Sequence, residues 1–158
     1  MKKGIIGIAS LLAGAAGGAI GTERVIRKKV SEKQKLADKH LALFLMMNQW
    51  VKVKQEGKSL VRYFEKKKYE SIAIYGMSYA GETLADELKG SNIKIAYGID
   101  RNANNIYTDF EVVSPNDELE SVDAVVVTSI TYFEEIRNIL EEKMDCPILS
   151  LEDVLYEI

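Results

Sequence analysis

The chain has 158 residues, of which 47% are hydrophobic, with two prolines and a single cysteine. This length allows one domain with appendages and excludes a complete dehydrogenase. The net charge of −3 conceals an asymmetry, because residues 1–69 carry 16 Lys and Arg against 5 Asp and Glu, whereas residues 70–158 carry 5 against 19. The acidic half would repel phosphates, so we exclude nucleic acid as a partner.

The cysteine and histidine content limits the chemistry. One cysteine excludes an internal disulfide and a multi-cysteine metal site, and no metal ligands are predicted. Cys146 precedes Pro147 in an apolar stretch, which favours a buried structural thiol over a reactive one. His40, the only histidine, lies on the apolar edge of a predicted helix with no catalytic partner close in sequence. We expect it to have a packing or surface role.

Residues 4–21 contain no charge. As a helix they would extend about 27 Å, just enough for a hydrocarbon core. Their glycines form two G-x-x-x-G pairs, Gly14/Gly18 and Gly17/Gly21, a spacing typical of membrane-helix packing. A single N-terminal membrane anchor over residues 1–21 is therefore favoured. A cleaved signal peptide and a soluble Gly/Ala helix packed in an oligomer remain alternatives.

Basic residues follow this segment closely. They are Arg24, Arg27, Lys28, Lys29, Lys33 and Lys35. By the positive-inside rule they place the remainder of the chain on the cytoplasmic face of the cell membrane. The predicted organisation is thus an anchor over 1–21, a basic helical connector over 22–69 and an acidic module over 70–158.

The pattern of apolar residues in the connector predicts a helix over about residues 22–56, a break at Gly57 and a second short helix. One face of the long helix is apolar and is predicted to be its inner face: Leu36, Leu43, Phe44, Met47, Trp50 and Val51. The run 41–47 (LALFLMM) is apolar nearly all round, so a second surface must also be covered, by another subunit or by the module. We therefore expect a homo-oligomer joined through the connector helices.

Strands and helices alternate in residues 70–158. The predicted strands are 71–75, 93–99, 123–128 and 147–149. The predicted helices run from the turn after residue 76 to Lys89, from Ser114-Pro115, from a Thr131/Glu134 capping box, and after Ser150. This order predicts an α/β fold, a small parallel Rossmann-like sheet preceded by N-terminal helices, whose ligands collect at the carboxyl ends of the strands.

The first strand is followed by a G-x-G-x-x-G turn in which Gly76 and Gly81 are kept and Ser78 replaces the middle glycine. Ser78 crowds the approach of a pyrophosphate, and an acidic residue in the first helical turn competes for the positive end of the helix dipole. We nevertheless expect a nucleotide-type ligand. Its predicted contacts are Gly76, Ser78, Tyr79 and Gly81 at the phosphates, Asp100 at the ribose, and Thr128 and Ser129 along the pocket. Retention of the fold without a ligand is the alternative.

Two catalytic motifs are rejected on their positions. The turn around Ser78 is similar to a nucleophile elbow, but the only histidine precedes it by thirty-eight residues, whereas a hydrolase needs that base after the serine. Tyr63 and Lys67 have the Tyr-x-x-x-Lys spacing of short-chain dehydrogenases, but they precede the first strand instead of following the nucleotide-binding turn. No catalytic residue is predicted. An NAD-dependent nucleotide-sugar oxidoreductase or epimerase remains an alternative, although the sequence offers no proton donor in the position that such an enzyme requires.

The segments IAIYGMSYAGETLADEL, IAYGIDRN, EVVSPNDELESVDAVVVTS and CPILSLEDVL together resemble a family of small Rossmann-like modules. These modules accompany bacterial surface-polysaccharide proteins such as membrane-bound nucleotide-sugar dehydratases, sugar transferases and methyltransferases. The resemblance covers about residues 70–155. The catalytic domain that usually accompanies such a module is absent here. It implies a membrane-anchored accessory protein that binds a nucleotide or nucleotide-sugar, with NAD also possible as cofactor, in cell-surface polysaccharide biosynthesis. A ligand-free scaffold is the remaining alternative.

Overall fold

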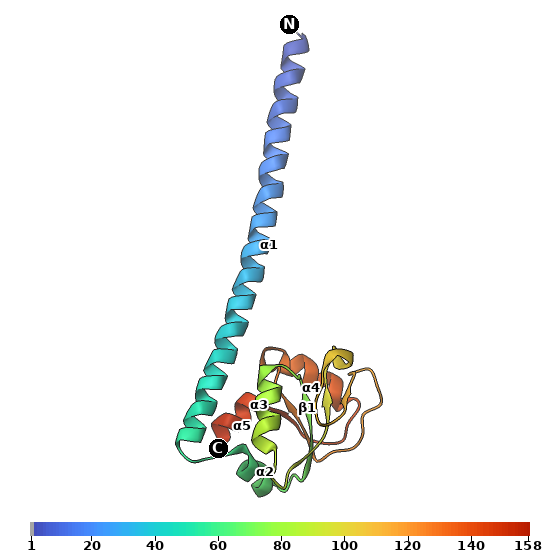
Figure 1. Ribbon diagram of the computed structural model, residues 1–158. Coiled ribbons are helices and arrows are strands. Elements are labelled where there is room, and N and C mark those ends of the chain that lie inside the picture. The colour runs from blue at the N-terminus through green and yellow to red at the C-terminus, as the bar shows by residue number, and fades with distance from the viewer. Residues whose placement is uncertain (1) are drawn as a thin grey trace. The chain divides into compact units, whose positions relative to one another are not determined.

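The computed structural model describes the backbone of residues 2–158 and the side chains of residues 26–158. The chain divides into two compact units, Met1–Leu41 and Ala42–Ile158. Helix α1 (Lys2–Gln55) provides the first unit and begins the second, and Figure 1 follows the chain from it to the C-terminus by colour. In the first unit every described side chain, from residue 26 to residue 41, is exposed.

No helix within the residues whose side chains are described is both long enough and apolar enough to cross a membrane. The anchor predicted for residues 1–21 lies outside those residues.

The predicted break at Gly57 is confirmed. Gly57 has a φ of +70°, and the N–H groups of Gly57 and Lys58 donate to the carbonyls of Lys54 and Val53, both at 3.0 Å. This pattern closes the helix with a left-handed glycine. Helix α2 (Leu60–Lys67) follows, with Ser59 as the N-cap whose side chain accepts from the N–H of Arg62.

Five parallel strands form one sheet in the order β3-β2-β1-β4-β5. The strands are β1 (Ser71–Tyr75), β2 (Lys94–Ile99), β3 (Val112–Val113), β4 (Ala124–Val127) and β5 (Ile148–Ser150). The predicted α/β fold with a parallel Rossmann-like sheet is confirmed. Strand β3 was not among the predicted strands, because two residues are too few to show a period.

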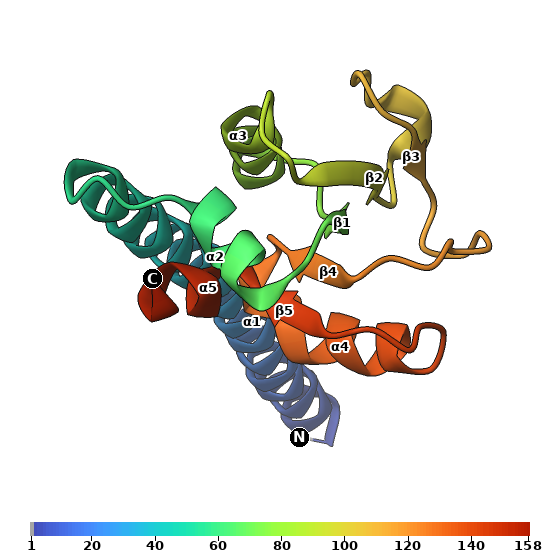
Figure 2. The same ribbon diagram turned by 90° about the horizontal axis from the view of Figure 1, so that it is seen from below.

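Helices cover both faces of the sheet, as Figure 2 shows. Along the chain they are α3 (Tyr79–Leu88), the 3₁₀ turns η1 (Ala103–Asn105) and η2 (Ile130–Tyr132), α4 (Phe133–Glu141) and α5 (Leu151–Glu157). One core cluster joins the sheet to α2, α3, α5 and the end of α1, and a second joins the opposite face to α4. Strand β1 contributes to both clusters because its side chains alternate between the two faces of the sheet. Ile72 and Ile74 face the first cluster, and Ala73 and Tyr75 face the second.

The predicted inner face of the connector is partly wrong. Met46, Trp50 and Val53 are the buried residues of α1, at 0%, 3% and 2% exposure, whereas Phe44 is 66% exposed and Val51 is 52% exposed. Because the run 41–47 is apolar on nearly all sides, its periodicity could not select the buried face. The predicted face included Trp50 but was rotated from the observed one.

Two predicted helix starts are also wrong. Ser114 and Pro115 open a turn instead of a helix, in which the Asp117 carboxylate accepts from the N–H of Ser114 at 2.8 Å. The residues after this turn contain too few apolar side chains to hold a helix on the sheet. The Thr131/Glu134 capping box does not form, because residues 130–132 make a 3₁₀ turn and Tyr132 takes the N-cap position of α4.

Candidate functional site

The carboxyl ends of β1, β2 and β4 lie side by side and carry the predicted site residues. Gly76 directly follows β1 and has a φ of +96°. A Cβ atom at Gly76 would lie 2.6 Å from the Ser129 Oγ and 2.7 Å from the Thr128 Oγ1. Both the backbone conformation and the space therefore require glycine at this turn.

Gly81 lies in the first turn of α3, where that helix meets the end of β1. A Cβ atom at this position would overlap the Gly76 carbonyl oxygen. The missing side chain lets α3 start against the strand, so its N-terminal N–H groups lie at the carboxyl edge of the sheet.

Asp100 follows β2 and is tied to the glycine turn. Its carboxylate accepts a hydrogen bond from the Met77 N–H and another from the Asn102 N–H, both at 2.8 Å. Because a carboxylate has about four acceptor positions, these two bonds leave positions for further donors. Asp100 is half-buried and thus connects the turn after β1 to the loop after β2.

Thr128 and Ser129 follow β4 on the other side of β1. Thr128 is 4% exposed, and its hydroxyl donates to the Gly76 carbonyl at 2.6 Å. Ser129 is half-buried and precedes η2. The structure therefore brings Gly76, Thr128 and Ser129 into one packed group, with Asp100 linked to it through Met77.

The other two predicted residues point away from this packing. Ser78 is the N-cap of α3, is exposed and makes no side-chain capping bond. Tyr79, the first residue of α3, is 80% exposed. Their N–H groups belong to the first turn of the helix, which has no preceding helical carbonyl to accept them.

Met77 is a component of the site that the sequence analysis missed. Besides donating its N–H to Asp100, it buries its side chain to 4% exposure. A Cβ atom at Gly98 would lie 3.0 Å from the Met77 Cγ, so the missing side chain of Gly98 in β2 provides the space that Met77 occupies. A glycine inside a predicted strand is a sequence signal of such a close approach.

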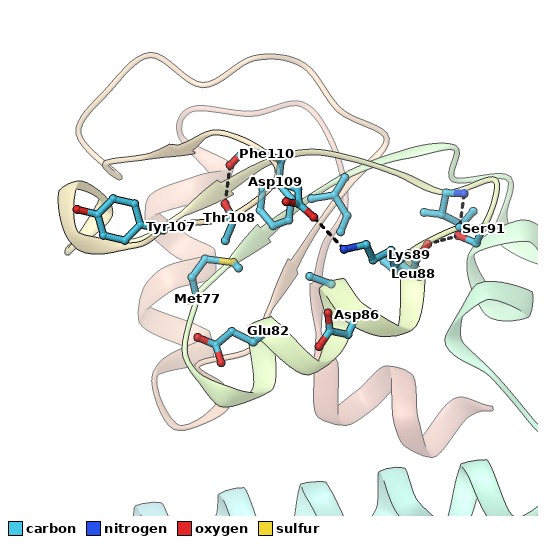
Figure 3. Close-up of a pocket in the computed structure, with 14 residues that line it drawn as sticks. Met77, Glu82, Asp86, Leu88, Lys89, Ser91, Tyr107, Thr108, Asp109 and Phe110 are labelled. Atoms are coloured by element: carbon cyan, nitrogen blue, oxygen red, sulfur yellow. Dashed lines mark hydrogen bonds and ion pairs between the residues drawn. The ribbon is translucent and has the colours of Figure 1, made fainter.

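A cavity of about 540 Å³ extends along α3 from Met77 and Glu82 towards Lys89, with the 107–110 loop as its other wall. Lys89 Nζ and Asp109 Oδ2 form an ion pair of 2.9 Å across it, as Figure 3 shows. The ion pair raises the pKa of Lys89 and lowers that of Asp109. Between β2 and β3 the chain forms the 3₁₀ turn η1 and no α-helix.

The Tyr63–Lys67 pair lies in α2, and both side chains contact Glu157. The Tyr63 hydroxyl donates to Glu157 Oε2 at 3.1 Å, and Lys67 Nζ lies 2.7 Å from Glu157 Oε1. Burial and the bond to Glu157 raise the pKa of Tyr63 to about 12. A tyrosine that exchanges protons near neutral pH needs a lowered pKa, so this pair stabilises the contact between α2 and α5.

No group of three or more His, Cys, Asp or Glu side chains is arranged to hold a metal ion in the part of the chain that the structure describes. Cys146 is half-buried beside the second core cluster. Burial raises the pKa of its thiol, which lowers the fraction of reactive thiolate.

Comparison with known proteins identifies the family. Residues 68–147 match the family model described as C2185-like, N-terminal. No curated protein and no solved structure matches the chain significantly. The match begins at the end of α2 and extends past α4, so it includes the glycine turn, Asp100 and the β4 edge. The chain therefore belongs to the C2185-like family, and residues 68–147 correspond to the N-terminal domain of that family.

Proposed function

We propose that this protein is a membrane-anchored accessory protein whose module binds a nucleotide or nucleotide-sugar at the carboxyl edge of the sheet. The observation that carries the proposal is the hydrogen bond between the Met77 N–H and the Asp100 carboxylate. It joins the glycine turn after β1 to the acidic residue after β2. In nucleotide-binding sheets these two positions contact the phosphates and the ribose.

The remaining acceptor positions of Asp100 suit ribose hydroxyls, which donate hydrogen bonds to a carboxylate. The first turn of α3 offers N–H groups to phosphate oxygens beside the exposed Ser78. Glu82 is exposed in that turn, and residues 70–158 carry 19 acidic side chains against 5 basic ones. These charges favour ligands with few phosphate charges, such as NAD or a nucleotide-sugar, over a nucleoside triphosphate.

The uncharged residues 4–21 and the basic cluster after them support attachment to the cytoplasmic face of the membrane. A nucleotide-sugar module at that surface suits the assembly of cell-surface polysaccharide, the pathway that the resemblance implies.

The test is calorimetric titration of the full chain, in mild detergent, with NAD, UDP-sugars and coenzyme A. We expect one of these to bind. Asp100→Asn should weaken that binding roughly ten- to a hundredfold, because hydrogen bonds to a charged acceptor contribute about 1.5–3 kcal/mol. Asp117→Asn is the matched control, since Asp117 also accepts a backbone N–H at 2.8 Å but lies in the turn after β3.

A second candidate is a scaffold that has kept the fold without a ligand. The Thr128 hydroxyl favours it, because its bond to the Gly76 carbonyl closes the turn with the protein's own groups. Absence of heat with all three ligands would reject the nucleotide proposal in favour of this scaffold. Equal weakening by Asp100→Asn and Asp117→Asn would instead remove Asp100 from the site.

A further inference from the structure

The second unit leaves one side of α1 uncovered. Phe44 is 66% exposed, Leu45 is 47% exposed and Val51 is 52% exposed. The opposite side of the same segment packs on the module through Met46, Trp50 and Val53. Residues 42–53 therefore have two apolar faces, of which the module covers one.

The exposed side chains recur at a seven-residue spacing. Val30, Ala37, Phe44 and Val51 follow one another at intervals of seven, and Gln34, Leu41 and Asn48 each lie four residues after one of the first three. These seven residues, here called the seam, alternate at four and three residues, which is the pattern of a coiled coil. All seven are exposed, in the first unit as in the second.

We propose that the seam is the interface of a parallel, in-register, two-stranded coiled coil between two copies of this chain. Val30, Ala37, Phe44 and Val51 take the d positions, and Gln34, Leu41 and Asn48 take the a positions. An asparagine at an a position pairs with itself across a parallel dimer and fixes register and strand number. Asn48 has that position, and in a lipid surface its amide would be buried without a partner.

Charge complementarity supports the same orientation. In this register Lys33 takes a g position and Asp38 takes the e position five residues later, so the two form opposite-charge pairs across a parallel dimer. The nearby basic residues Lys28, Lys29, Lys35 and Lys39 take positions b, c and f, outside the seam. Their mutual repulsion between copies is therefore reduced by distance and solvent.

Cysteine cross-linking of the full chain in mild detergent tests the register. In a Cys146→Ser background, Gln34→Cys and Asn48→Cys should form disulfide-linked dimers on mild oxidation. Lys35→Cys is the matched control, because residue 35 is adjacent and also exposed but lies outside the seam. Efficient cross-linking at 34 and 48 with little at 35 supports the proposal. Equal yields at 34 and 35, as a lipid-bound or unrelated surface would give, overturn it.

Two further variants test the packing and the charge pair. Phe44→Glu combined with Val51→Glu should abolish the Asn48→Cys cross-link and raise the dimer dissociation constant at least about a hundredfold. Tyr156→Glu alters a side chain on α5 that is 62% exposed. It should leave the cross-link and the dimer dissociation constant unchanged. Lys33→Glu should weaken the dimer, and Lys33→Glu with Asp38→Lys should restore it. A cross-link at residue 48 that survives both glutamates would contradict the seam as the interface.

Discussion

The Glu87 carboxylate accepts a hydrogen bond from the indole Nε1 of Trp50 at 2.6 Å. The same carboxylate accepts from the N–H of Leu60 at 3.0 Å and lies 3.1 Å from Lys54 Nζ. Its side chain is only 8% exposed. One acidic residue of α3 thus connects the end of α1 and the start of α2 to the module, and it satisfies a donor from each.

Glu87→Ala should destabilise residues 42–158 by about 1–3 kcal/mol, because it leaves the Trp50 indole and the Leu60 N–H without their acceptor. Urea unfolding followed by Trp50 fluorescence measures the loss. Asp86→Ala is the matched control, since Asp86 is the adjacent carboxylate on α3 and is exposed. Equal midpoints for the two variants would show that Glu87 does not stabilise this junction.

Gly81→Ala should destabilise the module although alanine favours helix by about 1 kcal/mol. The new Cβ would overlap the Gly76 carbonyl oxygen, so α3 or the turn must shift. Gly57→Ala is the comparison, because it introduces backbone strain without a clash. Gly57 has a φ of +70°, and a Cβ atom there would meet no atom within 4 Å. Thermal unfolding should show the larger loss at Gly81. A stabilised Gly81→Ala would mean that the helix start is less closely packed than this geometry requires.

Asp123 should make stability depend on pH. Its carboxylate accepts from the N–H groups of Ser71 and Glu70, each at 2.8 Å, and these bonds lower the pKa of Asp123 in the folded state. The stabilisation is therefore fully present above the unfolded pKa, about 4, and is lost as the pH falls through the lower folded value.

The measurement is urea unfolding of Asp123→Asn and of the unaltered chain at pH 7 and near pH 3. At pH 7 the unaltered chain should be more stable than Asp123→Asn. The difference in stability between these two proteins should be smaller near pH 3. Asp145→Asn, at an exposed position before β5, controls for the loss of one negative charge. A difference that stays constant across this range would exclude Asp123 as its source.

Cys146 should react slowly with a disulfide reagent at pH 8. Burial raises the pKa of the thiol, so less thiolate is present than for a free cysteine, and the half-buried side chain further limits access. Unfolding in urea should accelerate the reaction. Glu142→Cys in a Cys146→Ser background provides an exposed thiol for comparison. Similar rates for the two folded proteins would contradict this environment.

Much of the fold could be predicted from sequence because its signals are local. The apolar run 71–75, the glycine turn and the run 124–127 each define an element within a few residues, and their alternation with helices selects a parallel sheet. Local signals also placed the end of α1 at Gly57. They were too weak for β3, which has two residues, and they predicted a helix at Ser114 where Asp117 closes a turn.

The sequence alone determined the order of the four longer strands and the positions of Gly76, Asp100 and Thr128 at strand ends. Only the tertiary structure decided that Met77 donates to Asp100, because that contact joins two loops twenty-three residues apart. It also decided which side of α1 is buried. A helix segment that is apolar nearly all round has no preferred inner face until a partner surface excludes water from one side, and here that surface comes from α2, α3 and α5.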